Sequence, residues 1–163
     1  MTSLKIKIKL IIVIFHCMIL NLSIAQNLGN EKMVKLSFLG GEWIGISKTY
    51  ENGKLIKEIP VFERINYDLD SSILVLQLNS EALLLHTIIY FDETDNTYYY
   101  YPFSKHGVRP APAVFKNGQL VVQSSEIKRF IFAKTEQGFR EYGEVFENGR
   151  WIKYFQDDFI NTN

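Results

Sequence analysis

Residues 48–59, Lys-Thr-Tyr-Glu-Asn-Gly-Lys-Leu-Ile-Lys-Glu-Ile, contain the pattern of a β-hairpin. Within them, Asn52-Gly53 joins two β-type runs, and an Asn-Gly pair readily adopts the two positive φ angles of a tight type I′ turn between antiparallel strands. The same pair recurs at Asn117-Gly118 and Asn148-Gly149, again between runs rich in β-branched and aromatic residues. Three such turns predict an antiparallel β protein.

Polar turn clusters divide the rest of the chain into further short runs of the same kind. They lie at residues 68–71, 92–96 and 135–138 and have the polar composition typical of turns. The stretch from Pro102 to Pro112 is predicted to be a loop at one rim of the sheet, because a proline cannot donate a hydrogen bond to a neighbouring strand. Ten strands follow from this division, at residues 41–50, 54–67, 72–80, 82–91, 96–102, 111–116, 119–125, 127–134, 138–146 and 150–159.

Short connections between the predicted strands favour an up-and-down meander, which leaves two architectures, a barrel and a two-sheet sandwich. The barrel is favoured because a meander can pair its first strand with its last and so remove both edges. Before the first strand, residues 30–36 predict a short capped helix with Met33 and Leu36 on one side. We therefore expect an all-β fold, a single up-and-down antiparallel β-barrel of about ten strands with a short N-terminal helix closing one end.

The first 25 residues have the three parts of a signal peptide. Three lysines without any acidic residue precede an apolar run over residues 10–20, and Ser23 and Ala25 supply small residues at the cleavage position. The apolar run is about half the roughly 20 residues of a membrane-spanning helix, and no second long run follows it. We expect a signal peptide at residues 1–25, a single lipocalin-like β-barrel domain at residues 26–163, no permanent membrane anchor after cleavage, and a periplasmic or secreted location.

Composition and motifs exclude several functional classes for the mature chain. The single cysteine, Cys17, lies in the predicted leader, so no disulfide, thiolate catalysis or thiolate metal site is expected. Removal of the leader leaves 15 basic residues against 18 acidic ones, which argues against a nucleic-acid partner. The sequence has no nucleophile elbow, His-Glu-x-x-His motif or glycine-rich phosphate loop. We therefore expect no enzyme, no cofactor and no metal.

Residues 38–45, Phe-Leu-Gly-Gly-Glu-Trp-Ile-Gly, open the first predicted strand and contain the spaced triplet Gly41, Trp43 and Gly45. The Gly-x-Trp pattern resembles the opening of the lipocalin and fatty-acid-binding families, and Gly-x-Trp-x-Gly resembles nitrobindin and its bacterial lipocalin-like relatives. In those calycin-type families the tryptophan lies inside, at the closed end of the barrel. The resemblance implies an exported lipocalin-like barrel whose floor is formed by these three residues.

Departures from those families limit what the resemblance implies. A nitrobindin-like haem barrel uses a histidine on a late strand as the iron ligand, whereas no histidine occurs here after His106. We therefore expect no haem bound through a histidine. In lipocalins a basic residue of the last strand covers the tryptophan, and either Arg150 or Lys153 could have that role.

Arg140 and Tyr142 are candidates for a site that holds the head group of a ligand. They share one face of a predicted strand, and they resemble the Arg-x-Tyr pair with which fatty-acid-binding proteins hold a carboxylate, although here the pair falls one strand early. If that face points inward, the ligand has an anionic or polar head and an apolar body. If it points outward, fatty-acid-like anions are disfavoured, because Glu141 is then the only charge among the lumen residues Phe139, Glu141, Gly143 and Val145.

Three further residues could contact a ligand from neighbouring strands. His86 lies in an apolar run, where it either faces the lumen or is bonded in the wall or exposed. Residues 98–101 are four tyrosines, so two of them, predicted as Tyr98 and Tyr100, would line a pocket or fill the core.

Charged residues within the predicted strands are expected to lie mostly outside the barrel. Arg64, Arg129 and Arg140 would require a partner such as Glu63, Glu141 or a ligand anion if they pointed inward. Asp157 and Asp158 alternate across a strand, so their carboxylates should point apart, and both are predicted to be surface charges.

Two functional hypotheses follow from the sequence. The first is an exported carrier that encloses a small hydrophobic or amphipathic molecule in its barrel. The second is a non-enzymatic envelope or interaction protein that works through its outer surface, because 12 Phe and 9 Tyr are enough to fill a small barrel. An open cavity favours the first hypothesis, and a fully packed lumen favours the second.

Overall fold

The structure is a computed structural model that describes residues 31–162. The predicted signal peptide and its cleavage position lie outside the described residues. Helical structure in the described part is confined to a turn at residues 31–34 and the 3-10 helix η1 (Ser37–Leu39). The strands are β1 (Gly41–Glu51), β2 (Lys54–Asp68), β3 (Ile73–Ser80), β4 (Leu84–Asp92), β5 (Thr97–Ser104), β6 (Gly107–Val108), β7 (Ala111–Lys116), β8 (Gln119–Ser125), β9 (Lys128–Lys134), β10 (Gly138–Glu147) and β11 (Arg150–Asn161).

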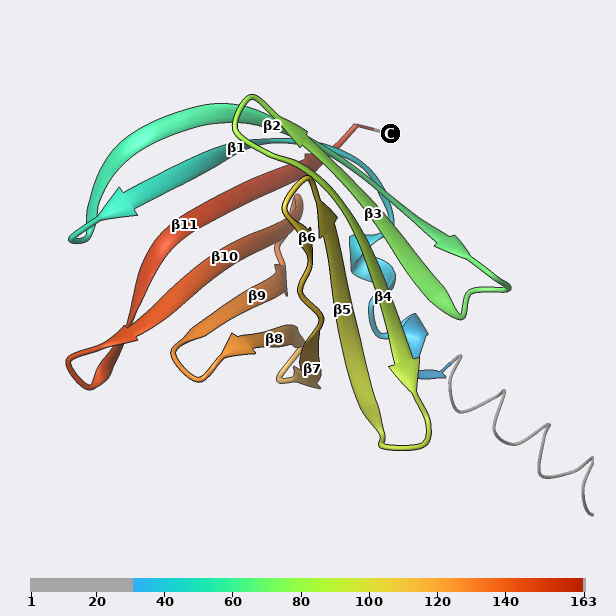
Figure 1. The fold of residues 1–163 in the computed structure, drawn as a ribbon. Helices are drawn as coiled ribbons and strands as arrows, with labels where there is room; N and C mark the ends of the chain where they lie inside the picture. Colours follow the sequence, from blue (N-terminus) through green and yellow to red (C-terminus); the bar gives the residue numbers. More distant parts are fainter. Residues whose placement is uncertain (1–30, 163) are drawn as a thin grey trace, which may run out of the picture.

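The strands form a closed antiparallel barrel (Figure 1). Hydrogen-bonded neighbours follow in the order β4-β3-β2-β1-β11-β10-β9-β8-β7-β5, and β4 also pairs with β5, which closes the ring. The first strand pairs with the last, as residues 43–49 of β1 lie opposite residues 155–161 of β11. The predicted antiparallel barrel of about ten strands is confirmed, with β6 as an additional strand.

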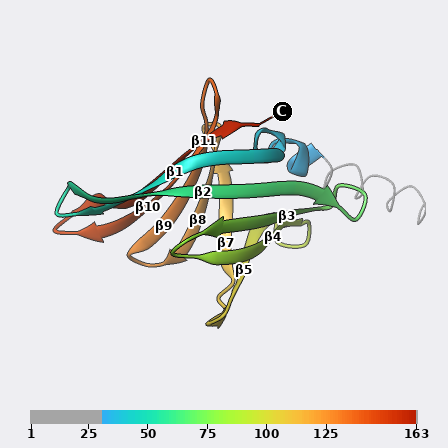
Figure 2. The same ribbon diagram turned by 90° about the horizontal axis from the view of Figure 1, so that it is seen from above.

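The hairpins β1–β2 and β10–β11 extend to one end of the barrel, away from the N-terminal segment (Figure 2). Each ends in an Asn-Gly turn with positive φ at both residues, 50° and 74° at Asn52-Gly53 and 52° and 78° at Asn148-Gly149. The third pair, Asn117-Gly118, joins β7 to β8 with φ angles of 53° and 76°. These values are those that a type I′ turn requires, so the predicted turns are confirmed.

The stretch from Pro102 to Pro112 differs from the predicted rim loop. β5 continues as far as Ser104, and β6 pairs back on it through a turn at Gly107, where φ is 98°. The chain then returns to the barrel, where Ala111 pairs with Tyr100. Beyond Tyr100, β5 no longer pairs with β7, and a proline is tolerated at such an edge.

The N-terminal segment closes one end of the barrel, although its helical turn is shorter than the predicted helix. Met33, Leu36 and Leu39 are fully buried within the core. Tyrosine hydroxyls of the barrel wall donate to its backbone, from Tyr67 to the Met33 oxygen and from Tyr98 to the Lys32 oxygen, each at 2.7 Å. Among residues 31–162, no helix is long and apolar enough to cross a membrane.

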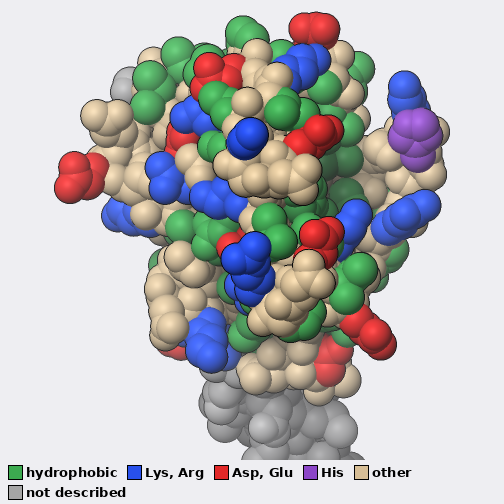
Figure 3. All heavy atoms as spheres, turned by 90° about the vertical axis from the view of Figure 1, so that its left-hand side faces the viewer, with side chains coloured by type: hydrophobic (Ala, Val, Ile, Leu, Met, Phe, Trp, Pro, Cys, Tyr) green, Lys and Arg blue, Asp and Glu red, His purple; other side chains and the backbone are tan. Residues whose placement is uncertain are grey.

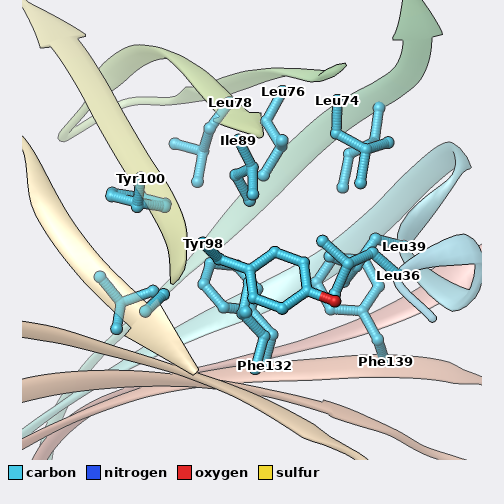
Figure 4. Close-up of a cluster of buried hydrophobic side chains, with 14 of the residues drawn as sticks. Leu36, Leu39, Leu74, Leu76, Leu78, Ile89, Tyr98, Tyr100, Phe132 and Phe139 are labelled. Carbon is cyan, nitrogen blue, oxygen red and sulfur yellow. The ribbon is translucent and has the colours of Figure 1, made fainter. Parts of the chain in front are cut away.

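Apolar side chains fill the half of the barrel next to this segment. Figure 4 shows Leu74, Leu76 and Leu78 on one wall and Phe132 and Phe139 on the facing wall, with Leu36 and Leu39 of the N-terminal segment beside them. The cluster draws on both sides of the ring, and its largest fully buried apolar members are Met33, Leu36, Leu39, Ile65, Leu74, Ile89, Leu120, Phe132, Phe139 and Phe159. This dense half of the interior forms the hydrophobic core.

Trp43 lies at the closed end of the barrel, in the position that the resemblance implied. It is 4% exposed, its Nε1 donates to the Leu39 oxygen at 2.7 Å, and its ring meets that of Phe139 edge to face at 5.0 Å. The two flanking glycines allow close approach. A Cβ on Gly41 would lie 3.4 Å from the indole, and one on Gly45 would lie 2.3 Å from the Asp158 oxygen of the paired strand.

We expect Trp43→Ala to destabilise the protein by about 3–5 kcal/mol, the cost of deleting a buried large aromatic side chain. The matched control is Trp151→Ala, which removes an indole that is only partly buried and should cost less. Urea unfolding measures both. A Trp43→Ala variant within about half a kcal/mol of wild type would contradict the structural role assigned to this residue.

Candidate ligand-binding site

The half of the barrel away from the N-terminal segment encloses a cavity of about 310 Å³. Figure 3 looks at the end with the extended hairpins and shows hydrophobic side chains in a recess beside a projecting lobe. The lining is mostly apolar, with a few polar groups, as is typical of small-molecule sites. Its residues are Ser47, Thr49, Lys57, Ile59, Val61, Leu78, Ser80, Ala82, Leu83, Leu85, Tyr100, Pro102, Phe130, Glu141, Phe155 and Asp157.

Strand alternation sets the depth of each residue in this half of the barrel. Along β2, Lys57, Ile59 and Val61 line the cavity from the mouth inward, and Glu63 occupies the next inward position. Along β11, Asp157 lines the cavity and Phe159 of the core follows it. The cavity therefore ends where the packed core begins.

Three buried carboxylates lie at this boundary. Glu63 of β2 is 2% exposed, Glu141 of β10 is 7% exposed and Asp157 of β11 is 5% exposed. Glu141 and Asp157 are direct cross-strand partners, and Asp157 is also paired with Ser47 of β1. We call these three residues the acidic layer.

The acidic layer has no basic partner within the described residues. The ion pairs of residues 31–162 involve other carboxylates, namely those of Glu42, Glu144 and Asp158. Oε2 of Glu63 and Oδ1 of Asp157 are buried without any hydrogen-bond partner. Buried polar atoms normally have such partners, so these two oxygens are an exception with a cost of about 1–3 kcal/mol each.

Burial raises the pKa of all three carboxyl groups of the acidic layer. Desolvation raises the pKa of Glu63 to about 8, and the nearby charge of Asp157 adds to that effect. Burial, followed by the charges of Glu63 and Asp157, raises the pKa of Glu141 well above its ordinary value. Burial raises the pKa of Asp157 to about 6, against the opposing effect of a hydrogen bond from Ser47.

Two tyrosines extend the polar surface around Glu141. Tyr100 faces inward from β5, and its hydroxyl accepts a hydrogen bond of 3.5 Å from Thr87. Burial raises the pKa of Tyr100, and the charge of Glu141 raises it further. Burial also raises the pKa of Tyr154 to about 12, again with Glu141 as the second cause. Both hydroxyls therefore stay protonated at neutral pH.

The structure places Arg140 and Tyr142 on the outer face of β10. The Arg140 Nε donates to Oδ1 of Asp158 at 2.5 Å, and the Tyr142 ring lies under the Lys153 ammonium at 4.8 Å. The burial of Phe139 and Glu141 shows that the opposite face points inward. The sequence left two orientations of this strand open, and the structure has the one with Glu141 in the lumen. The expectation that Arg140 and Tyr142 form an anion site inside the barrel is therefore wrong.

The remaining candidates divide between the two faces of the wall. His86 is exposed on the outer face of β4, because Leu85 and Thr87 take the inward positions on either side of it. Tyr98 and Tyr100 both point inward, as predicted for the inner pair, and only Tyr100 lines the cavity. Tyr98 belongs to the core and to the closed end.

The arginines that were predicted to lie outside the barrel do so, whereas the basic residues that could have covered Trp43 lie far from it. Arg64 is paired with Glu42 at 2.8 Å and Arg129 with Glu144 at 2.6 Å, in both cases outside the lumen. Neither Arg150 nor Lys153 covers Trp43, because they lie at the other end of β11 from its Trp43 partner, Asn161.

Glu63 and Asp157 are site residues that the sequence did not identify. Asp157 was predicted as a surface charge, and this is wrong: alternation separates it from Asp158, but it is Asp157 that points inward. A signal for Glu63 does exist in the sequence. It lies at the period-two spacing of Ile59, Val61 and Ile65, which form the inner face of β2.

A second hollow, of about 720 Å³, lies on the outer face of the barrel. Its apolar lining comes from β11, β1 and β2 and includes Ile44, Ile46, Phe62 and Ile160, each more than a third exposed. It lies on the opposite side of the wall from the acidic layer. The charged residues in its lining are Lys48 and Asp158, and these two form an ion pair with each other.

The described residues contain no group of three or more His, Cys, Asp or Glu side chains arranged to hold a metal ion. No protein-family model matches the chain, and no characterised protein matches it in sequence.

We expect stability to fall as pH rises from about 5 to 8. Between the ordinary pKa of 4.5 and the folded value of about 8, Glu63 holds a proton in the folded state that the unfolded chain has released. Each such group contributes a slope of about 1.4 kcal/mol per pH unit at most within its window. Asp157 acts in the same direction between 3.8 and about 6.

Urea unfolding across this pH range tests the slope, with Glu63→Gln as the informative variant. This substitution removes the titrating group, so the decline with pH should become shallower. Glu42→Gln, at an exposed glutamate, is the control and should keep the wild-type slope. Stability that stayed constant or rose towards pH 8 would contradict the assignment of raised pKa values.

Proposed function

We propose that the protein is a carrier that binds a small amphipathic molecule in the cavity above the acidic layer. The observation that carries this proposal is a cavity of about 310 Å³ with apolar walls and buried, unpartnered carboxylate oxygen at its base. The volume is at the lower end of the range for small-molecule sites, about 300–1,000 Å³.

The distribution of polar groups supports an amphipathic ligand. Ile59, Val61 and Leu85 provide apolar contacts along the walls, whereas Glu141 and Asp157 supply polar atoms at the inner end. An apolar body would lie against the walls, and a polar head would reach the carboxylates. A fully apolar ligand would leave those carboxylates without partners, which is costly.

Export and membership in the lipocalin-like group belong to the same proposal. The closed barrel with Trp43 buried at one end supports a calycin-type relationship, and the leader-like composition of residues 1–25 supports a periplasmic or secreted location. The role is binding rather than catalysis, and the ligand, not a haem or a metal, completes the site.

The alternative, a barrel that acts through its outer surface, also has a specific observation in its favour. Half of the interior is filled by the protein's own side chains, and the outer hollow exposes apolar residues such as Ile44 and Phe62. The open half of the lumen favours the carrier.

Isothermal titration with octan-1-ol tests the carrier proposal with a neutral amphipathic probe. Wild type should bind it, and Leu85→Trp should weaken binding by about tenfold or more, because the larger side chain fills the cavity. Leu84→Trp is the matched control, since Leu84 is the adjacent residue on the outer face and is 67% exposed. Equal binding by Leu85→Trp, or no binding to wild type by octan-1-ol and its amine and acid analogues, would contradict the proposal.

A further inference from the structure

We propose that the head group of the ligand is a protonated amine, held by Asp157 and Glu141 at the inner end of the cavity. This inference rests on the proposed function, because it names the class of molecule that the cavity takes. It also reverses the sign of charge that the Arg-x-Tyr resemblance implied.

The two carboxylates converge on one place in the cavity. Glu141 and Asp157 are directly opposite each other on β10 and β11, and both line the cavity. Opposed residues on one face of an antiparallel pair have Cβ atoms about 4.5–5.5 Å apart. Both residues are more than nine-tenths buried from solvent, and both are among the lining residues of the cavity.

The carboxyl groups at this place match the donors of an ammonium group. Glu141 and Asp157 both line the cavity, and neither has a basic partner within the described residues. A primary ammonium has three N–H donors and no acceptor. Hydrogen bonds between an ammonium and a carboxylate are about twice as strong as those between neutral groups.

The positions of the basic residues argue against an anionic head group. Among the cavity-lining residues, the basic one is Lys57, which is exposed at the mouth and not at the inner end. Arg64, Arg129 and Arg140 are all paired on the outer face. A carboxylate ligand at the inner end would therefore meet carboxyl groups and no cation.

Binding of an ammonium requires the acidic layer to ionise, so affinity should depend on pH. The titratable groups that act on Glu141 and Asp157 are Glu63 of β2, Tyr100 of β5, and Tyr154 and Asp158 of β11, and the Ser47 hydroxyl of β1 donates to Asp157. Both tyrosines stay protonated, whereas Asp157 and Glu63, with pKa values of about 6 and about 8, release protons as the pH rises towards 8. An alkylamine stays charged throughout, because its pKa is about 10, like that of lysine. Amine affinity should therefore increase from pH 6 to pH 8.

Calorimetric titration with three eight-carbon probes that differ in head group tests the inference on the complete barrel. At pH 8, octylamine should bind at least about tenfold more tightly than octan-1-ol, and octanoate should bind more weakly than both. Octan-1-ol or octanoate binding as tightly as octylamine would overturn the inference and leave the carrier proposal intact. Absence of binding by all three would overturn the carrier proposal itself.

Neutral variants then locate the site. Glu141→Gln and Asp157→Asn should each reduce octylamine affinity about tenfold or more, while octan-1-ol affinity, which reports an intact cavity, should change by less than about threefold. Glu144→Gln is the matched control on β10, because Glu144 is paired with Arg129 outside the lumen. Unchanged octylamine binding in both lumen variants, or octylamine affinity that did not increase between pH 6 and pH 8, would overturn the assignment.

Discussion

Closure of the sheet determines which side chains face the lumen. Once β4 pairs with β5 and β1 pairs with β11, each of the ten strands of the ring has neighbours on both sides and a defined inner face. Because side chains alternate with a period of two, one residue of known orientation then fixes its strand as far as the next bulge. Burial of Trp43 on β1 places Ser47 inward, and Ser47 lies opposite Asp157. The composition of the lumen follows from these pairings.

The interior of the closed barrel has two parts. One is a packed apolar core that stabilises the fold, and the other contains a cavity and buried carboxyl groups that reduce its stability. The N-terminal segment and the aromatic rings around Phe139 fill the first half, where burial of apolar surface supplies most of the stability. The second half retains a cavity, and buried carboxyl groups lie where the two halves meet. Protonation reduces the cost of burying Glu63 and Glu141, as their raised pKa values show.

Most of the fold could be predicted from the sequence because its signals are local. The predicted strand 54–67 corresponds to Lys54–Asp68 in the structure, since Asn-Gly turns specify hairpin ends. The site was harder to predict because strand orientation depends on residues far apart in the chain. Neither face of residues 139–146 is uniformly apolar, so the sequence leaves both orientations of β10 open. Only the pairing of β10 with β9 and β11 places Glu141 inside and Arg140 outside.

The energetics of the acidic layer make a purely structural role difficult to sustain. Apolar residues of similar volume at these three positions would remove both the desolvation cost and the unpartnered oxygens, and replacement of buried charged groups in this way is often neutral or stabilising. A structural carboxylate would be expected to have a fixed donor, as Asp158 has in Arg140, Lys48 and Gln156 on the outer face. Asp157, its neighbour in sequence, has a hydrogen bond from Ser47 but no basic partner, keeps Oδ1 buried without a partner, and lines the cavity. The contrast between these adjacent residues separates their positions: Asp158 binds neighbouring strands together on the outer face, whereas Asp157 points inward and lines the cavity beside its cross-strand partner Glu141.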